Sequence, residues 1–239
     1  MIGEFSQIII CTALAGLAMP VGGLIACLER IRPNWLEEEF RHTLTAFGGG
    51  VLFSAVSLVL VPEGIQGLSW PLVGVAMLTG GFAFLFLDEA LSRRGTPAAQ
   101  LVAMLADFIP EALALGAAFA SQHSIGLLLA LLIGLQNLPE GFNAYRELTA
   151  SARLSRCRIL WGFVLLAALG PLAGISGRLF LTEHTLTLHM LMLFAAGGIL
   201  YLIFQDIAPQ AKLERRWAPP LGAVAGFLFG LIGQMLIVG

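Results

Sequence analysis

The residues best suited to chemistry are acidic and amide side chains inside two long apolar segments. Asp107 and Glu111 lie in one segment, and Gln136 and Glu140 lie in the next. The residues of each pair are four apart, so on a helix they share one face. Carboxylate and amide oxygens that converge in this way are ligands for a divalent cation.

Both segments also have a proline immediately before the glutamate, Pro110 and Pro139. Proline lacks an N–H group and its ring clashes with the carbonyl four residues earlier. We therefore expect the carbonyl groups of Ala106 and Leu135 to be freed as further oxygen ligands. Such carbonyls are tolerated at membrane depth only inside protein or along a cavity.

The composition places these segments in a membrane. The 239 residues are 58% hydrophobic and 12% charged, and the mean hydropathy is +0.88, whereas a soluble domain carries about 25% charged residues. This excludes a soluble enzyme, a disordered chain and a nucleic-acid binder. The net charge of −2 indicates no charged partner, and the three scattered cysteines exclude a disulfide framework.

Buried carboxylates in a bilayer need compensation. Each costs about 2.5–3.5 kcal/mol at the bilayer centre. Apart from Arg178, near the outer end of span 6, no Lys or Arg lies inside the predicted spans to pair with Asp107, Glu111 or Glu140. A cation, a proton or a water-filled cavity must compensate them. A single protonated glutamate could be a purely structural residue, but two Pro-Glu motifs on adjacent helices favour a site.

Eight apolar runs predict an all-α polytopic membrane protein, because each transmembrane helix needs about 20 apolar residues. The predicted spans are Phe5–Leu28, His42–Val61, Trp70–Leu91, Ala98–Ala120, Ile125–Ala144, Ile159–Leu181, Leu186–Ala208 and Leu221–Val238. They leave no length for a second soluble domain, so residues 1–239 are expected to form one domain. By the rise of a helix, the four polar residues lie about 15–24 Å below the loop that joins spans 4 and 5.

The positive charges predict the orientation. Every Lys and Arg except Arg178 lies in the loops after spans 1, 3, 5 and 7 or beside them. Such loops face the cytoplasm, so both termini should lie outside. We expect a multi-pass protein of the plasma membrane or of a bacterial inner membrane.

Spans 2 and 7 carry an internal repeat with a constant offset of 147 residues. Phe47, Gly50, Pro62 and Trp70 recur as Phe194, Gly197, Pro209 and Trp217. Five spans separate the copies, so they have opposite orientation, as in the inverted repeats of secondary transporters. The repeat halves would be about 5–91 and 159–238, with the hairpin 98–144 between them. The alternative is a chance likeness between Gly- and Pro-rich helices.

Charged residues elsewhere have simpler interpretations. Glu63, Asp88, Glu89 and Asp206 lie near span ends and are expected at the membrane interface. The acidic run at positions 37–39 is expected to be a solvated loop. The chain lacks the His-Glu-x-x-His, Gly-x-Ser-x-Gly and Gly-Lys-Ser/Thr motifs. It is therefore expected not to be an enzyme, to bind no organic cofactor, and to run any transport on gradients.

The six residues from Gln136 to Gly141, Gln-Asn-Leu-Pro-Glu-Gly, resemble the span 5 motif of the ZIP (Zrt/Irt-like) family of divalent-metal transporters. The endings of spans 2 and 7, at Pro62-Glu63 and Pro209, are similar to those of the family. The resemblance implies a 3+2+3 arrangement of eight helices, a homodimer, and an elevator-like movement of spans 1, 4, 5 and 6 against the others. Its motif also adds Asn137 to the candidate metal ligands.

Span 4 departs from the family pattern, His-Asn-x-Pro-Glu-Gly. Asp107 stands for the histidine, Phe108 for the asparagine and Ala112 for the glycine. Span 6 has Gly170-Pro171 where family members with two metals often carry a glutamate. We therefore expect a single altered metal site and no second one.

These observations predict a gradient-driven divalent-cation transporter. Zinc sites draw on His nitrogen and Cys sulfur, whereas the oxygen-only ligands here favour manganese or iron, with zinc as a competitor. One alternative is a metal-binding sensor or a non-transporting family member, which the altered span 4 motif suggests. Another is a transporter of a non-metal solute.

Labelling of Cys157 tests the orientation. Its neighbours Arg153, Arg156 and Arg158 should hold it in the cytoplasm. With Cys11 and Cys27 replaced by serine, a membrane-impermeant thiol reagent added to intact cells should not label the protein, while permeabilised cells should show labelling. Labelling of the protein in intact cells would contradict the predicted orientation.

Overall fold

A computed structural model describes residues 3–29, 34–93, 97–151, 155–211 and 217–239. Nearly all of these residues are helical, and no β-strand occurs among them. Eight helical segments in this part of the chain are long and apolar enough to cross a membrane. The prediction of an all-α polytopic membrane fold with eight spans is therefore confirmed.

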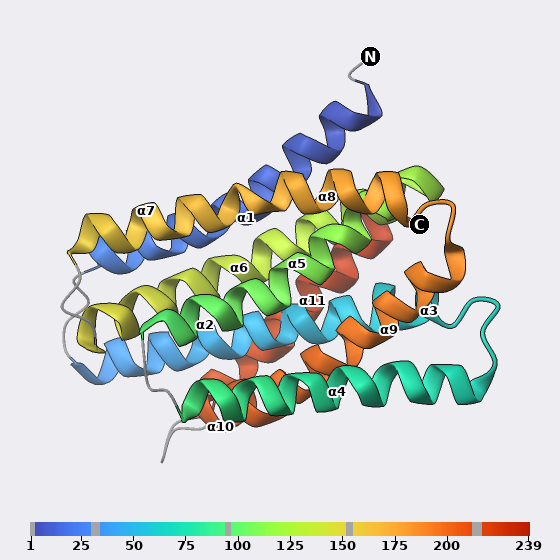
Figure 1. The fold of residues 1–239 in the computed structure, drawn as a ribbon. Coiled ribbons are helices and arrows are strands. Elements are labelled where there is room, and N and C mark those ends of the chain that lie inside the picture. The colour runs from blue at the N-terminus through green and yellow to red at the C-terminus, as the bar shows by residue number, and fades with distance from the viewer. Residues whose placement is uncertain (1–2, 30–33, 94–96, 152–154, 212–216) are drawn as a thin grey trace.

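The helices follow the chain in the order shown in Figure 1. The first three spans are α1 (Glu4–Leu28), α2 (Asn34–Ala55) with its continuations η1 (Val56–Leu60) and α3 (Val61–Gly64), and α4 (Trp70–Ser92). The next two are α5 (Pro97–Ser121) and α6 (His123–Ser151). The last three are α7 (Arg156–Ala167) with α8 (Leu169–Phe180), α9 (Thr185–Leu202) with η2 (Ile203–Ile207) and α10 (Ala208–Gln210), and α11 (Pro219–Ile237).

Two helices extend beyond their predicted ends. The acidic run at 37–39 lies in the first turns of α2, so its prediction as a loop is wrong. Carboxylates near a helix N-terminus interact favourably with the helix dipole, which explains this start. Helix α6 continues to Ser151, beyond the predicted span end at Ala144, and its last turns carry Arg146, which pairs with Glu29 and Glu37.

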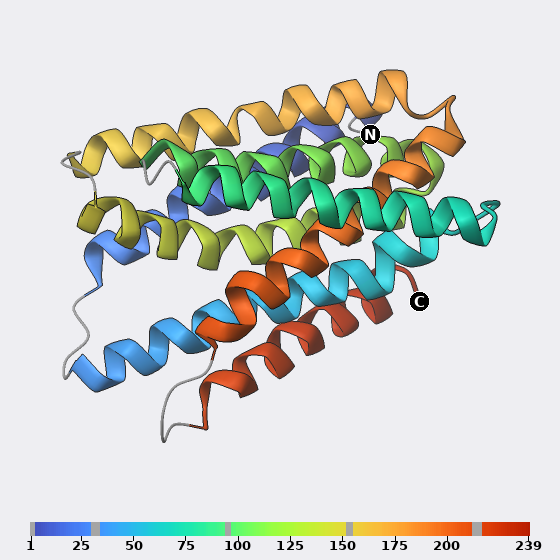
Figure 2. The ribbon, with the colours of Figure 1, turned by 60° about the horizontal axis from the view of Figure 1, so that its bottom comes forward.

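The helices form two bundles. In the first bundle, α1 packs against α6, α7 and α8, and α5 packs against α6 and α8. In the second bundle, α2 packs against α11 and α4 packs against α9. Figure 2 shows α1, α7 and α8 apart from α2, α9 and α11. The bundles meet where α2 contacts α6 and where α9 contacts α5.

Glycines allow the paired helices to approach closely. A Cβ atom at Gly226 of α11 would lie 2.0 Å from the carbonyl oxygen of Phe47 on α2, and one at Gly80 of α4 would lie 1.9 Å from that of Phe194 on α9. In the first bundle, a Cβ at Gly22 of α1 would lie 2.0 Å from the Leu138 carbonyl oxygen of α6. Small residues of this kind let membrane helices pack backbone against backbone.

The local geometry of spans 2 and 7 repeats at the offset found in the sequence. The π-helical segments η1 and η2 begin at Val56 and Ile203, 147 residues apart. Each precedes a proline, Pro62 or Pro209, which lacks an N–H group and displaces the carbonyl four residues earlier. The helix widens there, and the Val61 N–H donates to the Val56 carbonyl five residues back. The likeness between the two spans thus extends from residue types to backbone conformation.

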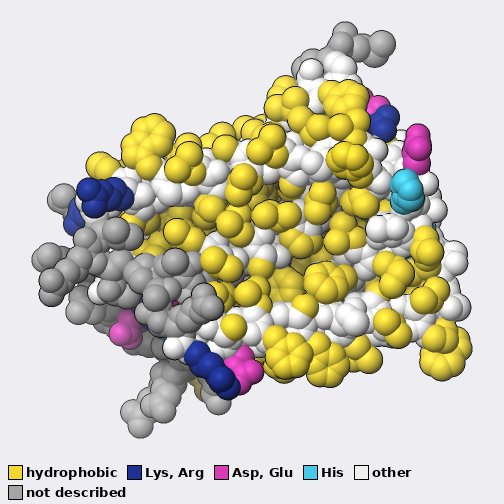
Figure 3. Space-filling view, viewed as in Figure 1, with side chains coloured by type: hydrophobic (Ala, Val, Ile, Leu, Met, Phe, Trp, Pro, Cys, Tyr) yellow, Lys and Arg dark blue, Asp and Glu magenta, His cyan; other side chains and the backbone are white. Residues whose placement is uncertain are grey.

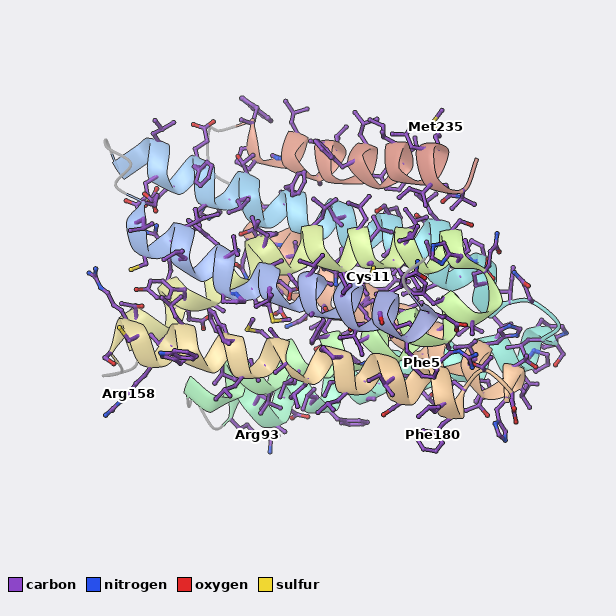
Figure 4. The ribbon with its side chains drawn as sticks, turned by 90° about the horizontal axis from the view of Figure 1, so that it is seen from above. Phe5, Cys11, Arg93, Arg158, Phe180 and Met235 are labelled. Atoms are coloured by element: carbon purple, nitrogen blue, oxygen red, sulfur yellow. The ribbon has the colours of Figure 1, made fainter. Side chains whose placement is uncertain are left out.

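The described arginines, apart from Arg178, lie toward one end of the molecule. The N- and C-termini lie at one end in Figure 1. Figure 4 places Arg158 at the opposite end from Phe5 and Phe180. We call the end that carries the last turns of α1, α4 and α6 and the first turns of α2, α5 and α7 the arginine end. Between the ends, Figure 3 shows a surface covered largely by apolar side chains, as lipid contact requires.

Substitution of Gly80 tests the contact between α4 and α9. We expect Gly80→Ala to lower stability by about 1–3 kcal/mol, the usual cost of overpacking, because the new Cβ would meet the Phe194 carbonyl oxygen. A Cβ at Gly74 of the same helix would lie more than 4 Å from every described atom of the other helices, so Gly74→Ala is the matched control. Thermal unfolding in detergent measures both, and equal midpoints would contradict the packing.

Candidate metal site

The site is built on α5 and α6, which pack as antiparallel neighbours joined only by Gln122. Pro110 lies within α5 and Pro139 within α6, and neither ends its helix. The prolines therefore remain at mid-span beside the acidic residues.

Glu111 and Gln136 meet directly between the two helices. The Gln136 Nε2 group donates to both carboxylate oxygens of Glu111, at 2.8 and 2.7 Å. Both side chains are buried, with exposed fractions of 1% and 0%. The hydrogen bonds satisfy the glutamate and fix the register of α5 against α6.

Asp107 and Glu140 face a cavity instead. The cavity has a volume of about 480 Å³ and lies between the two bundles. Thr45, Gly48 and Gly49 of α2 form part of the opposite wall. Because Ser92, Glu147 and Gln210 also line it, the cavity extends from the middle of the molecule toward the arginine end. The sequence-predicted site is thus divided into a pair that faces the cavity and a hydrogen-bonded pair behind it.

The carboxylates of Asp107, Glu111 and Glu140 are close enough to repel one another electrostatically. None of the described residues that line the cavity is Lys or Arg. Repulsion between buried carboxylates disfavours their ionisation unless protons or a cation neutralise them. The charges around the cavity therefore favour positively charged ligands.

Three buried oxygen atoms in this region have no hydrogen-bond donor. They are Asp107 Oδ1, Gln136 Oε1 and Asn137 Oδ1. A buried polar atom without a partner lowers the stability of the fold by about 1–3 kcal/mol, so a bound ligand is expected to satisfy such atoms. All three are acceptors, which either a water molecule or a cation can satisfy. Together with the buried carboxylates, these oxygen atoms fit a divalent metal ion.

Asn137 has a second contact that the sequence did not indicate. Its Nδ2 group donates to the backbone carbonyl of Ala15 on α1, at 2.9 Å. The side chain therefore holds α6 to α1 within the first bundle, while its oxygen stays available. Because 122 residues separate the two partners, no local pattern could have revealed the contact.

The predicted ligands are not assembled in this conformation. Among the residues that the structure describes, no three His, Cys, Asp or Glu side chains are gathered closely enough to hold a metal ion. Glu111 accepts both hydrogen bonds from Gln136 and does not line the cavity. Binding by Asp107, Glu111, Gln136 and Glu140 together would need Gln136 to release Glu111 and present its oxygen.

Phe108 occupies the position where the family resemblance would place a ligand for a second metal. Its side chain is 1% exposed. A Cβ at Gly170 would lie 2.7 Å from the Phe108 Cζ atom, and one at Gly16 would lie 3.0 Å from it. An apolar ring thus fills the space beside Gly170, and the region offers no oxygen from either residue's side chain.

Asp88 and Asp206 also line the cavity, although their positions near span ends had suggested the membrane interface. Asp88 accepts a hydrogen bond from the Tyr201 hydroxyl group at 3.2 Å. Asp206 lies on the π-helical η2. The presence of Asp88 and Asp206 within apolar spans was the only feature of the sequence that could have indicated an inward position. The packing of α4 against α9 shows that both residues face the cavity.

Comparison with known proteins gives one partial match. No family model matches the chain. Over 140 residues the chain is 34% identical to a protein of Myxococcus xanthus named zinc transporter GufA, and the match covers 56% of this chain and 54% of that protein. The chain therefore spans about half the length of the curated relative it matches.

Proposed function

We propose that this chain is a divalent-metal transporter related to the ZIP family. The observation that carries the proposal is the set of buried oxygen acceptors on α5 and α6, beside a cavity with three further carboxylates, Asp88, Glu147 and Asp206. The match to a protein named as a zinc transporter and the Gln136–Gly141 motif support the same substrate class.

The cation would lose most of its water and bind Asp107, Glu111, Gln136 and Glu140, with the Asn137 oxygen within the same region. Asp107 and Glu140 face the cavity and would meet the ion first. Gln136 would then turn its amide, so that Oε1 joins the ligands and Glu111 is released from Nε2. The gain in cation–oxygen contacts offsets the loss of the two hydrogen bonds.

Transport would follow from movement of the first bundle, which contains the site, against the second. The two bundles correspond to the sets of spans that the resemblance assigns to an elevator-like movement, within an inverted 3+2+3 repeat. The arginine end would face the cytoplasm and both termini the outside. The driving force would be a gradient, and the functional unit a homodimer in the plasma or bacterial inner membrane.

A second candidate is a protein that binds metal without moving it. The observation in its favour is that Gln136 occupies both oxygens of Glu111. A sensor or non-transporting member could use the release of this hydrogen-bonded pair as its signal. A transporter of a non-metal solute is the third candidate.

Uptake into proteoliposomes tests the proposal. We expect purified protein to move Mn²⁺, Fe²⁺ or Zn²⁺, and we expect Glu111→Ala and Glu140→Ala each to abolish uptake, because too few anionic oxygens remain to offset dehydration of the ion. Glu89→Ala is the control, since Glu89 pairs with Arg93 on the exposed surface of α4. Detergent extraction and gel filtration confirm that each variant still folds.

The outcomes separate the candidates. Binding without uptake by the native protein would favour the sensor, and neither binding nor uptake would favour a non-metal solute. Uptake retained in the Glu111→Ala/Glu140→Ala double variant would exclude the proposed site.

The ratio of Mn²⁺ to Zn²⁺ uptake tests selectivity. The predicted ligands supply oxygen only. Oxygen ligands favour Mn²⁺ or Fe²⁺, whereas Zn²⁺ sites draw on His nitrogen and Cys sulfur. We expect the native chain to move Mn²⁺ or Fe²⁺ at least as well as Zn²⁺, and Asp107→His to shift the ratio toward Zn²⁺. An unchanged ratio would show that Asp107 is not a ligand.

A further inference from the structure

The boundary between the two bundles contains a cluster of polar and aromatic contacts near the arginine end. Arg146 of α6 pairs with Glu37 of α2 through its Nη2 atom. Its Nη1 atom pairs with Glu29, which follows α1, at 2.6 Å. One guanidinium group thus joins a carboxylate of its own bundle to a carboxylate of the other.

Two further contacts lie beside this ion pair. The Asn143 Nδ2 group donates to Thr45 Oγ1 at 2.8 Å. Phe142 of α6 meets the Phe40 ring of α2 edge to face, with ring centroids 6.0 Å apart. We call these three contacts between α6 and α2 (Arg146–Glu37, Asn143–Thr45 and Phe142–Phe40) the α2–α6 contact.

Nearer the middle of the molecule the same two helices meet through small or apolar groups. A Cβ at Gly48 of α2 would lie 2.8 Å from the ring of Pro139 on α6. Gly48 and Pro139 both line the cavity. The contact at this point is apolar, whereas the polar contacts described above, which would oppose a shift of α6 along α2, lie at the arginine end.

The α2–α6 contact and the candidate metal site share one helix. Arg146 lies six residues after Glu140 on α6, about 9 Å along the helix axis. Glu140 and Asn143 both line the cavity. A displacement of α6 that carries Glu140 away from the cavity therefore also separates Arg146 from Glu37 and Asn143 from Thr45.

We propose that the α2–α6 contact holds the two bundles in the conformation whose cavity extends to the arginine end, and that it must open before the site can reach the other end. The contact is then a conformational element that sets how long the protein stays in this state. The requirement that the contact open rests on the proposed transport function, whereas its role in holding this conformation concerns only the two bundles.

Glu37 and Glu29 provide a matched pair of variants. Each removes one carboxylate from the same guanidinium group, but only Glu37→Gln weakens the link between the bundles. Glu29→Gln changes a contact inside the first bundle. If the effect comes only from the loss of a negative charge beside Arg146, it should appear in both variants. If it comes from the boundary between the bundles, it should appear in Glu37→Gln alone.

The reporter is a thiol introduced by Ala103→Cys in a chain whose three native cysteines are replaced by serine. Ala103 lines the cavity on α5 and is not a predicted ligand. In nanodiscs both ends of the protein are accessible, so the rate of reaction with N-ethylmaleimide reports the open cavity without any assumption about orientation. We expect Glu37→Gln to lower this rate roughly threefold or more, as expected for the loss of a partly buried ion pair, and Glu29→Gln to leave it unchanged.

Thr45→Val removes the acceptor of Asn143 without changing charge, and it should lower the rate in the same direction even if Glu37→Gln reduces the yield of folded protein. Unchanged rates in both Glu37→Gln and Thr45→Val, or equal effects of Glu37→Gln and Glu29→Gln, would overturn the proposal. Metal uptake by the same variants separates the two ideas. If the thiol reaction rate changes but no metal is taken up, the role of the α2–α6 contact is supported and the transport function is excluded. If metal is taken up but the thiol reaction rate is unchanged, the transport function is supported and the role of the contact is excluded.

Discussion

Three carboxylates on two adjacent helices, in the interior of an apolar membrane-spanning fold, impose the constraint on which the rest of the structure depends. Asp107 and Glu111 are almost fully buried, and burial penalises each charged form unless something compensates it. The structure compensates them in two ways. Gln136 donates to both oxygens of Glu111, and a cavity reaches Asp107 and Glu140. The site is thus divided between a hydrogen-bonded pair and a pair that faces the cavity, and in the proposed function a cation would bring the two pairs together.

The interiors of the two bundles and the boundary between them have different kinds of contacts. Within each bundle, glycines bring helix backbones together, as at Gly22 against Leu138 and Gly226 against Phe47. Between the bundles, Gly48 of α2 also approaches the Pro139 ring of α6 closely, but a cavity and the polar contacts of Arg146 and Asn143 lie beside this point. In the proposed movement of one bundle against the other, this boundary would open while the backbone contacts inside each bundle stay closed. In the proposed transport function, this boundary would be the route for an ion that leaves the site.

Helix α6 connects the candidate site to the boundary between the bundles. It carries Gln136 and Glu140 at mid-span, and Asn143 and Arg146 where it meets α2 near the arginine end. From Glu140 to Arg146, after Pro139, the chain is continuously helical, so a shift along the helix axis would move both residues together. A change at the proposed ligand Glu140 would thus be linked to a change at the bundle boundary.

The sequence alone determined the number of spans, the helical class and the residues that share a helix face, because these follow from composition and from spacings of three or four residues. It also indicated the repeat of spans 2 and 7, whose prolines impose the same local geometry. Only the tertiary structure decided that Glu111 faces Gln136, that Asn137 contacts Ala15, and that Arg146 joins two bundles. The partners in these contacts lie 25 to 122 residues apart, so their pairing depends on how whole helices pack. The acidic run at 37–39 is a further example. It was expected in a loop, but it lies in the first turns of α2, where Glu37 pairs with Arg146 of α6.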